Sequence, residues 1–153
     1  MNRLILPAES WILVCDGSKA LIFQNKGDAL HLNLQLWEAK SRPDERTRDI
    51  STERPGRSFS SVGKARSAVE GTDWHEIAET EFLGEVADGL ELLVRTQQVR
   101  DLVIVAPARA LGVLRTCLGQ GARGVLKAEI SKDLCKLPTP EIEAYFAAMR
   151  QLP

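Results

Sequence analysis

The sequence has few of the residues that usually identify a metalloprotein or a disulfide-stabilised protein. Its 153 residues include three cysteines, two histidines and only 5% aromatic residues. Cys15, Cys117 and Cys135 are far apart and form no C-x-x-C pair. Because this spacing fits neither a zinc site nor a disulfide framework, we interpret them as buried, reduced thiols and expect no metal site.

Long hydrophobic runs are also absent. No apolar run approaches the roughly 20 residues that a membrane-spanning helix needs. Leu4-Ile5-Leu6 is too short for the apolar core of a signal peptide and is followed by Pro7 and Glu9. We therefore expect a cytoplasmic protein that does not insert into a membrane.

Neither sign of charge is in large excess. The formal net charge is −1, with 27% charged and 44% hydrophobic residues. These values fit an ordinary soluble protein and argue against one that coats nucleic acid over its whole surface, although a local basic patch is compatible with them. The length corresponds to about one domain, so we predict a single α/β domain over residues 1–153.

The motifs of common enzymes and cofactor-binding proteins are missing. There is no G-x-S-x-G elbow, no P-loop and no Rossmann glycine pattern, so we expect no cofactor and assign no catalytic residue. Acids that could hold the metal of a nuclease are spread along the chain: Asp16, Glu76, Glu79 and Asp101. Asp101 stands at the wrong end of its strand to join Asp16, and Asp16 is explained as a turn residue. His31 and His75 fit exposed polar positions, so catalysis is not favoured.

The first part of the chain predicts three antiparallel strands. Residues 11–15 form a uniformly apolar strand, and Asp16-Gly17 followed by the apolar run 20–23 is a strong hairpin signal. A second turn at 25–28 leads into residues 30–37, where leucines alternate with other residues. This alternation predicts a strand with its leucine face toward the core.

The second part alternates helices with strands. The expected elements are a helix over 73–98 with a capping box at Asp73 and Glu76, a strand over 101–106, a helix over 111–118 that stops at Gly119-Gln120-Gly121, a strand over 125–130 and a helix from Thr139. The last two strands form a parallel crossover unit. The predicted fold is α/β, a mixed five-stranded sheet of order 3-2-1-4-5 with helices on both faces, which is similar to ribonuclease H-like folds.

A long polar segment, from about residue 40 to 73, separates these two parts. Compact domains seldom keep an unstructured connection longer than about 12–15 residues unless it is functional or disordered. Its basic core, 54–66, contains no acid after its first arginine. Arginine and serine can donate hydrogen bonds to phosphate oxygens, and glycine lets the backbone approach a ligand closely. An aromatic ring can stack on a base. A solvated linker has the same composition, so both interpretations stay open. The candidate binding residues of this basic core are Arg54, Gly56, Arg57, Ser58, Phe59, Gly63, Lys64 and Arg66.

A second candidate lies at Ala106-Pro107-Ala108-Arg109, between a strand and a helix. Ligands favour the carboxyl ends of parallel strands, and anions favour helix N-termini. Arg109 is therefore a candidate binding residue, although an exposed arginine in an ordinary βα turn has the same pattern.

Several segments together resemble the bacterial host attachment protein family. They are Trp11-Ile12-Leu13-Val14-Cys15-Asp16-Gly17-Ser18-Lys19-Ala20, Arg54-Pro55-Gly56-Arg57-Ser58-Phe59, Val103-Ile104-Val105-Ala106-Pro107-Ala108-Arg109-Ala110-Leu111-Gly112 and Lys132-Asp133-Leu134. The family name implies a part in attachment to host cells. The family is also distantly similar to the central domain of archaeal and eukaryotic peptide-chain release factors, whose Gly-Gly-Gln loop lies between the third strand and the first long helix. The basic core occupies that position without a Gly-Gly-Gln sequence.

These observations lead to one main hypothesis and two alternatives. The main hypothesis is a non-enzymatic binding protein that contacts RNA or the ribosome through the basic core. One alternative is an interaction protein for host attachment that acts through protein or carbohydrate contacts. The other is a hydrolase or nuclease that uses Asp16 or Arg109.

Overall fold

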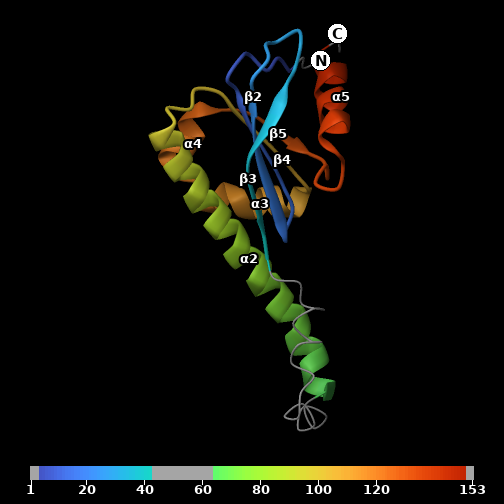
Figure 1. The fold of residues 1–153 in the computed structure, drawn as a ribbon. Coiled ribbons are helices and arrows are strands. Elements are labelled where there is room, and N and C mark those ends of the chain that lie inside the picture. The colour runs from blue at the N-terminus through green and yellow to red at the C-terminus, as the bar shows by residue number, and fades with distance from the viewer. Residues whose placement is uncertain (1–3, 43–63, 151–153) are drawn as a thin grey trace.

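The protein folds as a mixed α/β unit, seen in a computed structural model that describes residues 4–42 and 64–150 (Figure 1). Within α2, side chains are described from Trp74 onward. In chain order the described elements are β1 (Trp11–Cys15), β2 (Lys19–Asn25), β3 (Leu34–Ser41), α2 (Lys64–Thr96), β4 (Leu102–Ala106), α3 (Ala108–Cys117), α4 (Gln120–Val125), β5 (Leu126–Ser131) and α5 (Thr139–Arg150).

The five strands form one sheet in the order β3-β2-β1-β4-β5, which confirms the predicted order. β1 pairs antiparallel with β2 and parallel with β4, and β4 pairs parallel with β5. Every residue of β1 and of β4 is buried. Their uninterrupted apolar sequences are what a strand covered on both faces requires. The comparison with ribonuclease H-like folds is not confirmed and stays a prediction.

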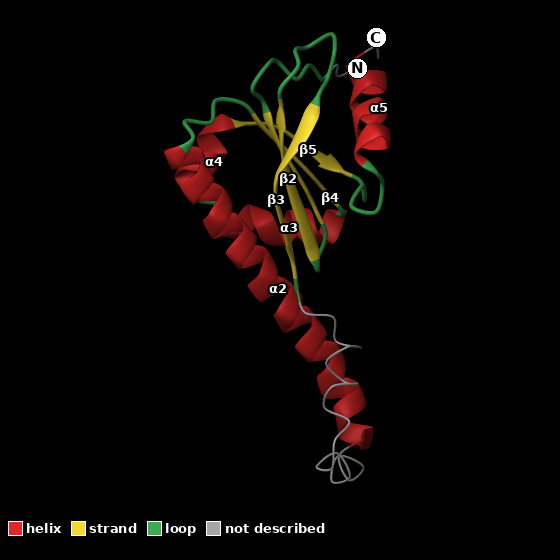
Figure 2. Cartoon of the chain, viewed as in Figure 1, coloured by secondary structure: helices red, strands yellow, loops and turns green. Residues whose placement is uncertain are grey.

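Helices cover both faces of the sheet, as predicted. α2, α3 and α4 lie on one face and α5 lies on the other (Figure 2). Alternate residues of β1 divide between the two resulting cores: Leu13 belongs to the same core as Leu90 of α2, and Ile12 to the same core as Phe146 of α5. Successive side chains of a strand point to opposite faces of the sheet, so the five residues of β1 contribute to both cores.

β3 begins later than the sequence pattern predicts. The strand runs from Leu34, and Leu30 and Leu36, both expected in the core, are 67% and 54% exposed. The Asn25 side-chain oxygen accepts hydrogen bonds from the backbone N–H groups of Gly27 and Asn33, each at 3.0 Å. These bonds hold residues 26–33 in a turn, because asparagine side chains can replace backbone partners in this way. The pairing of β3 with β2 also shifts register at Ile22/Phe23, which breaks the simple alternation.

α2 begins nine residues before the predicted start, at Lys64 instead of Asp73. Asp73 therefore does not cap the helix, and the polar connection is shorter than the predicted 40–73. Among the described side chains of α2, which begin at Trp74, the first buried one is Phe82, whereas Trp74 is 65% exposed. Figure 1 shows that the first turns of α2 extend beyond the sheet. Apolar periodicity marks the face of a helix that packs on a core, so it did not predict this part.

α4 is a helix that the sequence analysis did not predict. Gly119-Gln120-Gly121 was interpreted only as the end of the preceding helix, but Gln120 opens α4. The Glu91 carboxylate of α2 accepts hydrogen bonds from the backbone N–H groups of Gly121, at 3.1 Å, and Ala122, at 2.9 Å. A Cβ atom on Gly119 would come within 2.6 Å of a Glu91 carboxylate oxygen. Gly119 thus leaves room for the carboxylate of Glu91, and this requirement comes from α2 and not from the local sequence.

No helix in the described parts of the chain is both long enough and apolar enough to span a bilayer.

The packing of α2 can be tested with two leucines of the same helix. Leu90 is 0% exposed and Leu92 is 59% exposed. We expect Leu90→Ala to lower the free energy of unfolding by about 2–5 kcal/mol, because it opens a cavity in the core. Leu92→Ala should cost less than about 1 kcal/mol, and it corrects for the change in helix propensity. Urea denaturation followed by circular dichroism measures both values, and equal losses would contradict this orientation of α2.

Candidate ligand-binding site

The carboxyl ends of β1 and β4 lie side by side, because the two strands pair in parallel with Val14 opposite Val105. After β1 the chain continues to β2, on one side of this pair of strands. After β4 it continues to β5, on the other side. In open α/β sheets such a switch point forms a crevice where ligands commonly bind.

The turn between β1 and β2 is fixed by hydrogen bonds. One Asp16 carboxylate oxygen accepts from the backbone N–H groups of Ser18 and Lys19, each at 2.8 Å. This confirms the turn role predicted for Asp16. On the other side of the turn, Arg42 Nε donates to the Gly17 carbonyl at 3.1 Å. The turn therefore holds the Arg42 side chain at the edge of the sheet.

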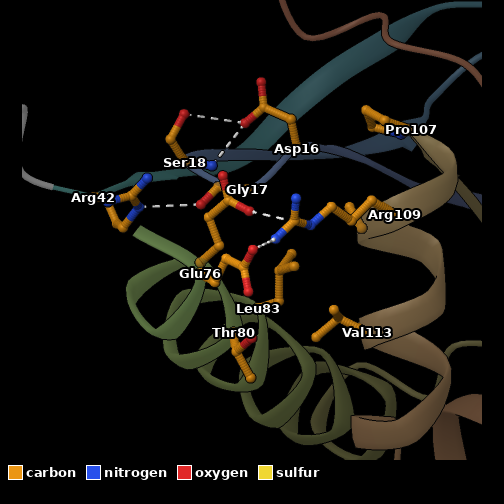
Figure 3. A pocket seen from close by; sticks show the side chains of 12 residues that line it. Asp16, Gly17, Ser18, Arg42, Glu76, Thr80, Leu83, Pro107, Arg109 and Val113 are labelled. Carbon is orange, nitrogen blue, oxygen red and sulfur yellow. Dashed lines mark hydrogen bonds and ion pairs between the residues drawn. The ribbon is translucent and has the colours of Figure 1, made fainter. Parts of the chain in front are cut away.

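A cavity of about 370 Å³, here called the edge cavity, opens between this turn, α2 and the start of α3 (Figure 3). Polar side chains of the turn and of α2 surround it, with an apolar floor from α2 and α3. Its lining residues are Asp16, Gly17, Ser18, Arg42, Glu76, Glu79, Thr80, Leu83, Pro107, Arg109, Ala110 and Val113.

Arg109 connects α3 with α2 across the edge cavity. Its guanidinium lies 3.3 Å from a Glu76 carboxylate oxygen and 3.8 Å from a Glu79 carboxylate oxygen. Figure 3 shows Arg109 pointing into the cavity toward Glu76. The Arg109 side chain is 63% exposed, and ion pairs this exposed contribute at most about 1 kcal/mol. An incoming ligand can therefore replace either glutamate at small cost.

Gly17 allows α2 to approach the turn closely. A Cβ atom at this position would lie 2.7 Å from the side-chain carboxyl carbon of Glu79. The glycine thus has a second role besides its place in the hairpin turn, because it lets the Glu79 carboxylate lie beside Arg109.

The N-terminus of α3 also faces this edge. Pro107 occupies its N-cap position, no side chain of the described residues caps it, and no acid stands in its first turn. The first N–H groups of a helix have no intrahelical partner and carry partial positive charge. These N–H groups, together with Arg42 and Arg109, can attract an anion into the edge cavity. The nearby acids oppose this attraction.

The residues predicted to bind are only partly described. Arg54, Gly56, Arg57, Ser58, Phe59 and Gly63 lie outside the described residues, and Lys64 and Arg66 belong to the first turn of α2 without described side chains. Arg109 is the predicted binding residue that the structure describes, and it lines the edge cavity. Arg42 was not among the predicted binding residues, and the approach of Glu76 and Glu79 to Arg109 was not predicted either, because both depend on tertiary contacts.

The other predicted polar positions lie away from this edge. The Asp101 carbonyl accepts a hydrogen bond from the backbone N–H of Trp11, which is the first residue of β1. Asp101 is therefore at the opposite edge from Asp16, as predicted. His31 Nδ1 lies 3.7 Å from a carboxylate oxygen of Asp28, and the His31 side chain is 87% exposed.

The cysteines are free, with Cys15 and Cys135 buried as expected and Cys117 partly exposed. Burial raises the pKa of the Cys15 thiol well above its usual range, and Cys135 and Asp16 add to this effect. Burial, followed by the charges of Asp16 and Asp133, raises the pKa of the Cys135 thiol to about 12.

The fold and the edge cavity define an α/β protein with a ligand-sized crevice at the carboxyl edge of its central parallel strands. A family model described as "Protein required for attachment to host cells" matches residues 11–146, and the chain belongs to this family. The comparison with curated proteins gives no significant match.

The turn at this edge gives a stability prediction. Asp16→Ala should lower the free energy of unfolding by about 1–2 kcal/mol, because two backbone N–H groups lose a charged acceptor. Asp16→Asn keeps one acceptor oxygen in the same place and should lose less than half as much. Urea denaturation of both variants measures the difference. Equal losses would show that the side-chain oxygen does not hold the turn.

Proposed function

We propose that this member of the attachment family is a binding protein whose ligand is the phosphate backbone of RNA, either free or in the ribosome. The basic core 54–66 makes the main contact, and the edge cavity adds Arg42 and Arg109. The likeness to release-factor central domains stays a prediction from the sequence, and it favours the ribosome as the source of the RNA.

The described residues support this proposal through the pair of arginines at the edge cavity. Arg42 lines the cavity from the end of β3, and Arg109 lines it from the first turn of α3. The basic core follows Arg42 in the sequence and leads into α2, which supplies a third wall of the cavity. Residues 43–53 connect Arg42 with the basic core, and the other end of the core runs into α2. Guanidinium groups form paired hydrogen bonds with phosphate oxygens, which suits this arrangement.

Charge decides which part dominates the binding. Asp16, Glu76 and Glu79 outnumber Arg42 and Arg109 in the edge cavity, so the cavity alone is a weak site for a polyanion. The basic core adds four cations and no acid after Arg54. We therefore assign most of the affinity to the basic core and a positioning role to the cavity arginines.

RNA binding should depend on salt and on the basic core. We expect wild-type protein to bind a short labelled single-stranded RNA at low salt, with affinity that falls steeply as salt rises. Replacement of Arg54, Arg57, Lys64 and Arg66 by alanine should reduce the slope of log K against log salt by about 0.7 for each phosphate contact removed. Fluorescence anisotropy measures both quantities.

Lys127→Ala is the matched control, because Lys127 pairs with Asp101, 3.7 Å away, at the opposite edge of the sheet. It removes a cation but should leave the slope unchanged. Absence of RNA binding at low salt, or an unchanged slope in the fourfold variant, would overturn the proposed function.

The edge cavity has a test of its own. Replacement of Glu76 and Glu79 by glutamine removes two negative charges and releases Arg109, so RNA binding should tighten about fivefold, equivalent to ~1 kcal/mol. The matched control is the double variant Glu81→Gln and Glu85→Gln, which makes the same charge change on α2 outside the edge cavity. An equal gain in both double variants would mean that the cavity makes no specific contact.

A further inference from the structure

A second polar cluster lies at the same edge of the sheet and includes Asp16. Asp16 follows β1, while Asp133 and Cys135 follow β5. One ligand atom from each of these three side chains lies within 4.8 Å of the others. Residues far apart in the sequence therefore bring two carboxylates and a thiol together.

The thiol of Cys135 is buried and lies beside the two carboxylates. Cys135 is 2% exposed, and its sulfur donates one hydrogen bond, to the Lys19 carbonyl at 3.7 Å. Within residues 4–42 and 64–150, no donor makes a hydrogen bond to this sulfur. A buried sulfur within 4.8 Å of two carboxylate oxygens offers a cation three ligand atoms of suitable chemistry.

The two carboxylates have oxygens available for such a cation. The turn hydrogen bonds of Asp16 all use one oxygen, Oδ1, and its second oxygen accepts none from the described residues. In Figure 3 this second oxygen points away from Ser18. Among the described residues, the Asp133 side chain accepts one hydrogen bond, from the Cys135 backbone N–H at 3.3 Å, and it is exposed.

We propose that Asp16, Asp133 and Cys135 bind a divalent transition-metal ion of the zinc type. A thiolate with two carboxylates suits Zn²⁺ or Co²⁺, whereas Mg²⁺ and Ca²⁺ prefer oxygen ligands only. Ligand atoms of a tetrahedral zinc site lie about 3.6 Å apart, so the cluster must contract by roughly 1 Å. Rotation of the exposed Asp133 side chain can provide this movement.

Three protein ligands leave one coordination position for water or for an external ligand, as in zinc sites that are not purely structural. Binding of the metal replaces the thiol proton of Cys135, which passes to the solvent, so that the sulfur coordinates as a thiolate. Asp16 belongs to this cluster and to the edge cavity, so a bound ion would lie close to the proposed RNA site.

Titration of the full-length protein with Co²⁺ tests the site, because thiolate coordination gives an intense near-ultraviolet charge-transfer band. We expect the band to saturate at one Co²⁺ per chain and to disappear when Zn²⁺ is added. Cys135→Ser should abolish the band. Cys117→Ser should retain it, because Cys117 lies at the end of α3 outside the cluster.

Asp16→Asn provides a second, independent variant that keeps the turn acceptor and so should remain folded. It should weaken Co²⁺ binding at least about tenfold, which is the scale of effect seen when the surroundings of a metal are disturbed. Circular dichroism confirms that each variant is folded. The proposal is overturned if one equivalent of Co²⁺ produces no charge-transfer band, or if the band persists in folded Cys135→Ser.

Discussion

The parallel pairing of β1 with β4 is the constraint on which the rest of the structure depends. Both strands are buried throughout, so the sheet must have cover on both faces, and α2 and α5 provide it from opposite sides. The same pairing brings the carboxyl ends of the two strands together. After β1 the chain turns back into the antiparallel strand β2, whereas after β4 it crosses over to the parallel strand β5. The edge cavity lies where these two connections leave the sheet.

Features that depend on local sequence could be predicted. The apolar runs of β1 and β4 and the Asp16-Gly17 turn gave the strand order, since a parallel crossover allows few alternatives. The start of α2 could not be predicted from apolar periodicity, because its first turns extend beyond the sheet. α4 was missed because its N-terminus is held by Glu91, a residue 30 positions earlier in the chain.

The candidate site likewise contains some residues that the local sequence indicates and others that only tertiary contacts bring there. Arg109 was predicted because it stands just after a strand and at the start of a helix. Arg42 carries no such signal, and it reaches the cavity only because β3 ends beside the Gly17 carbonyl. The metal-ligand spacing rules likewise treat Cys135 as an isolated thiol, whereas the fold brings it within 4.8 Å of Asp16. Sequence spacing can identify metal ligands that lie on one segment. It misses ligands from distant segments that meet at the end of a sheet.

The central claim is that RNA bound by the basic core is positioned against the carboxyl ends of β1 and β4. Amide chemical shifts of the ¹⁵N-labelled protein, recorded while RNA is added, test this claim most directly. The account predicts that the amides of Gly17, Ser18 and Arg109 shift in a saturable manner, while that of Lys127, at the opposite edge, does not. Saturable shifts confined to the opposite edge, or the absence of any shift at Gly17, Ser18 and Arg109, would contradict it.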